Sequence, residues 1–257
     1  MFYTNMHLSK FLIFFFLLCF SASFSQVVNI ENKRNYDDTS GFSGSIDANC
    51  SAIKTKDLIV NLFFRPRIQY KSKNHYYLIL SDLMYSKGAD RVFSNLGMIH
   101  FQYAFRIKGP LKWENYYQVQ YNQLMDQRSR MLLGTGLRLK CYDKKGYKIF
   151  LGSSLFEERE EAVSSNNIHF GTRMSNYLSW YFDPKNHFFF SGVLYYQPLL
   201  SDFQNNRFLG QYALNFHFTK RTDFKLEFTH IYASDPLPGV VKSNFNSSFG
   251  IRLKLGE

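Results

Sequence analysis

The sequence is poor in several residue types, and each shortage excludes a class of protein. Three cysteines in 257 residues are too few for a disulfide framework. Six prolines and 15 glycines exclude collagen and low-complexity linkers. Beyond the N-terminus no apolar run reaches the roughly 18–20 residues of a spanning helix, which excludes a polytopic helical membrane protein. A membrane β-barrel stays open, because its strands carry apolar residues only at alternate positions.

Aromatic residues and positive charge are abundant instead. The 28 Phe, 18 Tyr and 2 Trp make up 19% of the chain, which excludes a disordered protein. The 31 Lys and Arg residues against 20 Asp and Glu give a net charge of +11. The basic residues are spread through the chain rather than gathered in one aromatic-rich patch, so we expect no nucleic-acid partner.

The first 25 residues have the features of a secretory signal peptide. A lysine precedes a ten-residue apolar block at 11–20, and small residues precede a cleavage site before Gln26. The apolar block is too short to span a membrane. We therefore predict an exported protein in which the polar stretch 26–40 forms a periplasmic lead-in.

Apolar and polar residues alternate with a period of two after residue 40, where almost no helical periodicity is found. In 243–255, apolar residues such as Phe249 share one face and polar residues such as Asn246 share the other. Residues 131–141 and 208–218 alternate in the same way. The pattern predicts twelve strands, near residues 41–52, 57–70, 74–86, 92–107, 112–125, 130–142, 146–158, 167–182, 187–198, 207–218, 222–233 and 243–255.

The connections between the predicted strands fall into two classes that alternate along the chain. One class is short and basic, as at 71–74 and 219–222, and the other is mostly longer and more polar, as at 159–166 and 233–242. Outer-membrane barrels have an even strand number, short periplasmic turns and longer outer loops. We predict an all-β, up-and-down antiparallel transmembrane barrel of about 12 strands over residues 41–257. A soluble barrel or sandwich is the alternative, because alternation does not say which face is outside.

Four stretches of the chain resemble the DUF481 family. These are VNIENKR at 28–34, GFSGSIDANCS at 41–51, and the segments 118–138 and 195–207. The resemblance implies a β-barrel in the outer membrane of Gram-negative bacteria, with no assigned function. It provides no catalytic residues to transfer to this chain.

No motif for catalysis or metal binding is found. The patterns HExxH, GxSxG and CxxC are missing from the sequence. We therefore expect no enzymatic activity, no cofactor and no metal site. The acidic run Glu157–Glu161 is expected to be a solvated outer loop, with cation binding as the less favoured reading. Cys50 and Cys141 are expected to be free thiols, with a bridge between them as the less favoured reading.

The polar face of the predicted strands carries the candidate functional residues. A charge on the lipid-facing side costs roughly 2–4 kcal/mol at mid-membrane, so the charged side chains should point into the lumen. The predicted lumen-lining residues are Arg67, His100, Arg106, Glu114, Arg138, Lys140, His217, Lys225, Glu227, Arg252 and Lys254.

Two main functions are consistent with this lumen. The first is a narrow channel in which basic residues guide small anionic solutes. The second is a closed structural or envelope-stress barrel that acts through its loops or turns, with the lumen charges simply paired. A lipid-modifying barrel enzyme is a distant third. The expected location is the outer membrane, and the expected partners are outer-membrane lipid, the barrel-assembly machinery during insertion, and small anionic solutes.

Overall fold

The structure is a computed structural model. The predicted signal peptide and Lys254 lie outside the residues it describes, and of the predicted lead-in only Ile30 and Ser40 are described. The described residues are 30, 40–54, 57–89, 91–165, 168–184, 188–218, 222–237 and 239–253.

Twelve antiparallel strands form one sheet, and each strand pairs with the next one along the chain. The predicted strand number and the up-and-down order are therefore confirmed. A short 3-10 helix, η2 (Gln123–Met125), lies between β5 and β6. The strands are β1 (Gly41–Lys54), β2 (Leu58–Lys71), β3 (His75–Gly88), β4 (Arg91–Lys108), β5 (Leu111–Asn122), β6 (Gln127–Lys144), β7 (Tyr147–Ala162), β8 (Ile168–Phe182), β9 (Phe188–Leu199), β10 (Asp202–His217), β11 (Thr222–Ala233) and β12 (Ser243–Leu253).

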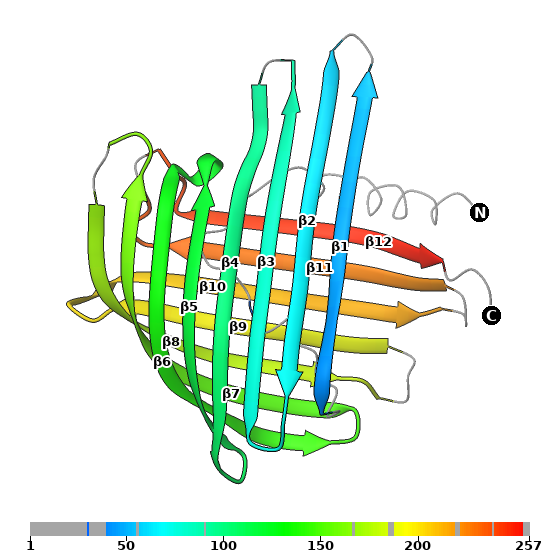
Figure 1. The fold of residues 1–257 in the computed structure, drawn as a ribbon, viewed down its shortest axis with the longest axis vertical. Coiled ribbons are helices and arrows are strands. Elements are labelled where there is room, and N and C mark those ends of the chain that lie inside the picture. Colours follow the sequence, from blue (N-terminus) through cyan, green and yellow to red (C-terminus); the bar gives the residue numbers. More distant parts are fainter. Residues whose placement is uncertain are drawn as a thin grey trace, which may run out of the picture.

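The sheet curls back on itself, so that β1–β4 cross in front of β8–β12 in the view of Figure 1. Its concave side, which we call the inner face, carries side chains that meet across several strands. Tyr177 of β8, for example, bonds to Glu114 of β5. The strands β1 and β12 are the two edges of the sheet. In the described part of the chain, no helix is long and apolar enough to cross a membrane.

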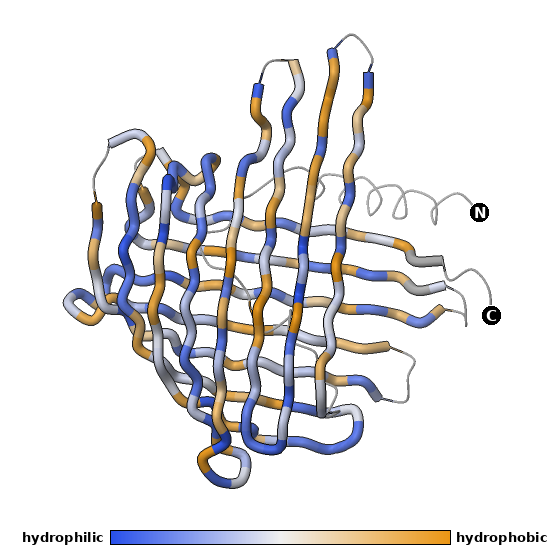
Figure 2. The backbone as a smooth tube through the Cα atoms, viewed as in Figure 1, coloured by the Kyte–Doolittle hydropathy of each residue, from blue (hydrophilic) through white to orange (hydrophobic). Residues whose placement is uncertain are grey.

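Burial on the two faces is the reverse of that in a soluble sheet protein. Side chains alternate between faces with a period of two, and along β6 the inward Arg130 and Arg138 are only 1% and 5% exposed. The outward Leu133 and Leu137 of the same strand are 63% and 48% exposed. Figure 2 shows the same alternation of hydrophilic and hydrophobic residues along most of the strands. The convex side, which we call the outer face, is therefore an apolar surface.

Two apolar patches interrupt the polar inner face. Ile30, from the predicted lead-in, is buried in the first patch, and a second patch lies on β9–β11. The first patch comprises Ile30, Tyr76, Leu78, Leu80, Met98 and Ala104, and the second comprises Val193, Tyr195, Leu209 and Ile231.

The structure corrects two loop predictions at one end of the sheet. The acidic run Glu157–Glu161 is not a solvated loop, because β7 continues to Ala162 and Glu158 and Glu160 are buried on the inner face. The stretch between the predicted strands 187–198 and 207–218 is also mostly strand, since β9 ends at Leu199 and β10 begins at Asp202. On β7 the alternation of faces continues to Ala162, whereas β10 begins with an irregular register between Asp202 and Asn206.

Candidate functional site

Five charged side chains from four strands form one buried cluster on the inner face. We call this cluster the charged layer, and each of its members is at most 6% exposed. Glu158 and Glu160 both face inward because they are two residues apart on β7. The members are Arg130 of β6, Glu158 and Glu160 of β7, Arg173 of β8 and Arg207 of β10.

Glu158 is the centre of the charged layer. Its carboxylate accepts hydrogen bonds from Arg173 Nε at 2.8 Å, from Arg207 Nη1 at 2.5 Å and from Arg130 Nε. Arg207 Nη2 also donates to Glu160 at 2.8 Å, so this guanidinium bridges the two carboxylates. Three cations against two anions give the layer one excess positive charge. Buried charges stay stable only while they are paired and hydrogen-bonded, so the layer depends on Glu158.

A row of amide side chains connects the charged layer to His100 on β4. Gln127 Nε2 donates to Glu160 Oε1 at 2.6 Å, Gln120 donates to Gln127 at 2.8 Å, and Gln118 donates to Gln120 at 2.6 Å. His100 Nδ1 lies 3.0 Å from Gln118 Oε1. An amide oxygen can only accept, so His100 Nδ1 is the donor. The row therefore crosses from β7 through β6 and β5 to β4.

Arg173 ties the layer to the ends of β9 and β10. Its Nη1 donates to the backbone oxygens of Gln197 and Asn205 at 3.3 and 3.2 Å, and its Nη2 donates to Asn205 Oδ1 at 2.7 Å. Asn205 in turn donates to Asp235 in the connection between β11 and β12. The layer is thus bonded to the backbone at the end of the sheet where the longer connections lie.

A second, smaller polar group lies on the inner face of β5, β6 and β8, further from the strand ends where the charged layer lies. Tyr177 donates to Glu114 Oε2 at 3.4 Å, and Arg138 Nη1 donates to the Tyr177 hydroxyl at 3.3 Å. The Arg138 guanidinium also lies 4.1 Å above the ring of Phe150. A cation over an aromatic face is stabilised by the ring quadrupole, so Arg138 has two kinds of partner.

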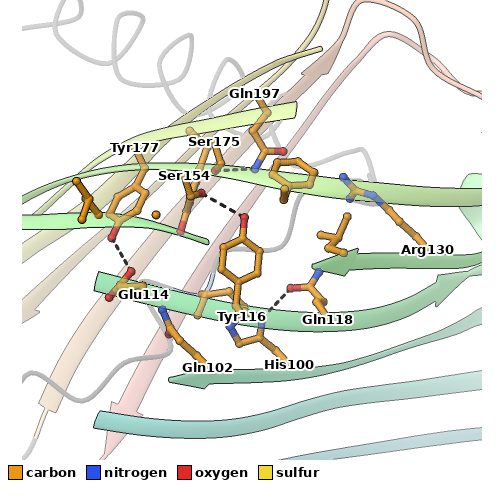
Figure 3. Close-up of a pocket in the computed structure, with 16 residues that line it drawn as sticks. His100, Gln102, Glu114, Tyr116, Gln118, Arg130, Ser154, Ser175, Tyr177 and Gln197 are labelled. Carbon is orange, nitrogen blue, oxygen red and sulfur yellow. Dashed lines mark hydrogen bonds between the residues drawn. The ribbon is translucent and has the colours of Figure 1, made fainter. Parts of the chain in front are cut away.

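A cavity of about 70 Å³ is lined by residues of both groups, with Arg130 in one part of its wall and Glu114 and Tyr177 in another. Figure 3 shows its polar walls, where Tyr116 bonds Ser154 and Gln197 donates to Ser175. The volume suits a few water molecules or a small solute group. In the described residues, no cluster of three or more His, Cys, Asp or Glu side chains could hold a metal ion.

The structure brings only part of the predicted lumen set into this site. His100, Glu114 and Arg138 are buried on the inner face and line or border the cavity. Lys225 and Glu227 pair with each other at 2.8 Å, away from the cavity. Four more predicted residues lie outside the site. Arg67 is half-buried on β2, Arg106 is exposed near the end of β4, Lys140 pairs with Asp143, and His217 is half-buried near the ring of Phe189. The side chain of Arg252 and all of Lys254 are outside the described part of the chain.

Sequence reasoning missed all five members of the charged layer. Arg130, Arg173 and Arg207 were not among the predicted residues, and Glu158 and Glu160 were assigned to a loop. The signal that could have found the two glutamates is the alternation on β7, which places Phe156, Glu158 and Glu160 on one face. The partners across the sheet carry no such local signal.

A comparison with protein-family models identifies the family of the chain. The family model described as "Protein of unknown function, DUF481" matches residues 61–254, which is most of the chain. The chain belongs to the DUF481 family. This confirms the resemblance seen in the sequence, and in this DUF481 protein the whole charged layer lies within the matched region.

Comparisons with curated proteins and with solved structures give no further information on function. No curated protein matches this DUF481 chain. Among solved structures, it is similar to the NanC porin, with a TM-score of 0.48 and 10% sequence identity. The likeness covers 82% of this chain and 100% of the porin chain.

Proposed function

We propose that this DUF481 protein is an integral outer-membrane β-barrel with a narrow lumen that passes small anionic solutes. The observation that carries the proposal is the reversed burial of the two faces. Large apolar side chains such as Leu133 and Phe249 are 60% or more exposed on the outer face, while the buried charged and amide side chains lie on the inner face. A lipid bilayer makes this arrangement stable, because it solvates an apolar wall and excludes charge.

The membrane environment also requires the sheet to close. Each unpaired backbone N–H or C=O group in hydrocarbon costs several kcal/mol, so open sheet edges do not occur there. The two edges of this sheet are β1 and β12. We therefore propose that β1 and β12 pair in the membrane and complete a barrel of twelve strands.

The native Cys50 provides a direct test of closure. Cys50 is a free, exposed thiol on the outer face of β1. In a Cys141→Ala background, single cysteines placed at Phe245, Ser247 or Phe249 on the outer face of β12 should form an intramolecular disulfide with Cys50 at one register. Absence of a bridge at all of these positions would mean that the edges stay apart.

The inner face suggests which solutes pass. The charged layer has one excess positive charge, and the second polar group beside the cavity holds one cation, Arg138, and one anion, Glu114. A ring of basic side chains in a narrow pore lowers the barrier for anions and raises it for cations. The charged layer is the proposed constriction.

Single-channel recording of the refolded mature chain in a planar bilayer tests the channel. With asymmetric salt we expect small, anion-selective current steps. Arg138→Ala should reduce the anion preference, whereas Arg128→Ala, on the outer face at the sheet end, should leave it unchanged. Cation-selective current from the unmodified chain would contradict the proposal.

A closed structural barrel is the second candidate, and one observation favours it. All three arginines of the charged layer bond to Glu158 and are almost fully buried, as expected where charges serve to hold the wall together. Heat-modifiable gel migration shows that a barrel is folded. If a chain that passes this test gives no current in the planar bilayer, the closed structural barrel is the correct candidate.

A further inference from the structure

Four polar side chains stand in the middle of the apolar outer face. They lie on four consecutive strands and near the centre of each one, and we call them the polar strip. Asn115, Thr135 and Ser153 face outward, because each lies two places from an exposed apolar residue on its own strand. Asn176 faces outward because it lies opposite Ser153 in the ladder. The polar strip consists of Asn115 on β5, Thr135 on β6, Ser153 on β7 and Asn176 on β8.

Hydrogen bonds join the members of the polar strip in pairs. The Thr135 hydroxyl donates to Asn115 Oδ1 at 2.9 Å and accepts a bond from Trp113 Nε1 at 2.7 Å. The Ser153 hydroxyl donates to Asn176 Oδ1 at 2.7 Å. The two pairs are neighbours, because Ser153 lies opposite Leu137, two residues from Thr135.

Apolar side chains surround the polar strip on the same face. Those on β6 and β7 are strongly exposed, with Leu133 at 63%, Leu151 at 47% and Leu155 at 46%. The outer face of β10 and β11 lacks such a strip, since aromatic and aliphatic residues such as Leu226 and Phe228 occupy its centre. A barrel wall of this fold therefore does not need polar residues at mid-height.

The polar strip keeps hydrogen-bonding capacity that its own members do not use. Among the described residues, neither Asn115 Nδ2 nor Asn176 Nδ2 donates to a partner. Lipid chains offer no acceptor, and an unmatched polar group in hydrocarbon is costly. A partner that satisfies the polar strip would therefore present an apolar surface with hydrogen-bond acceptors at its centre.

We propose that the polar strip is the surface through which two copies of this chain associate side by side in the membrane. A carboxamide both donates and accepts, so a copy related by a two-fold axis presents the matching groups. The apolar ring of Leu133, Leu151 and Leu155 then packs around the bonded centre, as apolar and small polar residues do between membrane segments. This inference rests on the proposed membrane location.

Crosslinking in vesicles tests the contact. In a Cys50→Ala, Cys141→Ala background, Leu133→Cys beside the strip should give a covalent dimer with a short bifunctional maleimide in phosphatidylcholine–phosphatidylglycerol vesicles. Leu226→Cys, on the outer face of β11, is the matched control and should stay monomeric. Equal crosslinking at both positions would indicate random collision and overturn the inference.

A second variant tests the hydrogen bonds themselves. Asn115→Leu combined with Asn176→Leu should weaken dimerisation in detergent at least about tenfold, measured by sedimentation equilibrium. Ser81→Leu, an outer-face change on β3, should leave it unchanged. The double variant should still show heat-modifiable migration, because leucine suits the lipid face.

The outcomes separate this inference from the proposed function. A chain that floats with vesicles and migrates as a folded barrel, but is a monomer without crosslinks, overturns the dimer and leaves the membrane location intact. A chain that does not float with vesicles overturns both.

Discussion

The inner and outer faces of β6–β8 obey opposite rules within the same strands. On the inner face, Arg130 is 1% exposed and every member of the charged layer is paired with an opposite charge. Leu133, three residues further along β6 on the outer face, is 63% exposed and lies opposite Tyr117 of β5. The comparison teaches that the inner face depends on specific charged pairs, whereas the outer face, apart from the polar strip, depends on being apolar. Substitutions should therefore fail on the two faces for different reasons.

Loss of the central carboxylate should have the largest effect. Glu158→Gln leaves three buried guanidinium groups with only Glu160 as an anion, and breaking a buried ion pair costs about 3–5 kcal/mol. We expect urea unfolding of the vesicle-inserted chain to shift by that amount. Glu157→Gln, the neighbouring change on the exposed outer face, should cost under about 1 kcal/mol. Equal effects would remove the distinction between the faces.

A charge on the outer face should be the next most damaging change. Phe249→Arg places a cation toward lipid at a cost of roughly 2–4 kcal/mol near mid-membrane, so we expect it to block assembly. Asn246→Arg, on the other face of β12, should assemble normally. Heat-modifiable migration of membrane fractions measures both, and tolerance of Phe249→Arg would refute the lipid-facing assignment.

Cysteine labelling sharpens the comparison with the smallest perturbation. Cys50 faces outward, and we expect it to react with a membrane-soluble maleimide but to resist a charged one in vesicles. Asn49→Cys in a Cys50→Ala background faces inward, and it should react with the charged reagent. The stability of both chains should stay within about 0.5 kcal/mol of the unmodified protein. The reverse labelling pattern would invert the assignment of the faces.

The sequence predicts the fold of this protein far better than its site. Period-two alternation places Phe249 and Asn246 on opposite faces and marks all twelve strands. His100, Glu114 and Arg138 could be assigned to the inner face for the same reason. The charged layer could not be predicted, because the bond from Arg207 of β10 to Glu158 of β7 depends on the curvature of the sheet across two intervening strands. The acidic run also resembles a solvated loop in composition, and only its partners keep it in a strand.

The amide row between Glu160 and His100 has a direction. Each glutamine donates toward the carboxylate and accepts from the side facing His100. A negative charge at one end thus orients three dipoles in series, and the last one decides which imidazole nitrogen carries hydrogen. The donor nitrogen of His100 on β4 is in this way fixed by a row of hydrogen bonds that begins at a carboxylate on β7. Four neighbouring strands thus share one directed series of side-chain hydrogen bonds, in addition to the backbone ladder that pairs them.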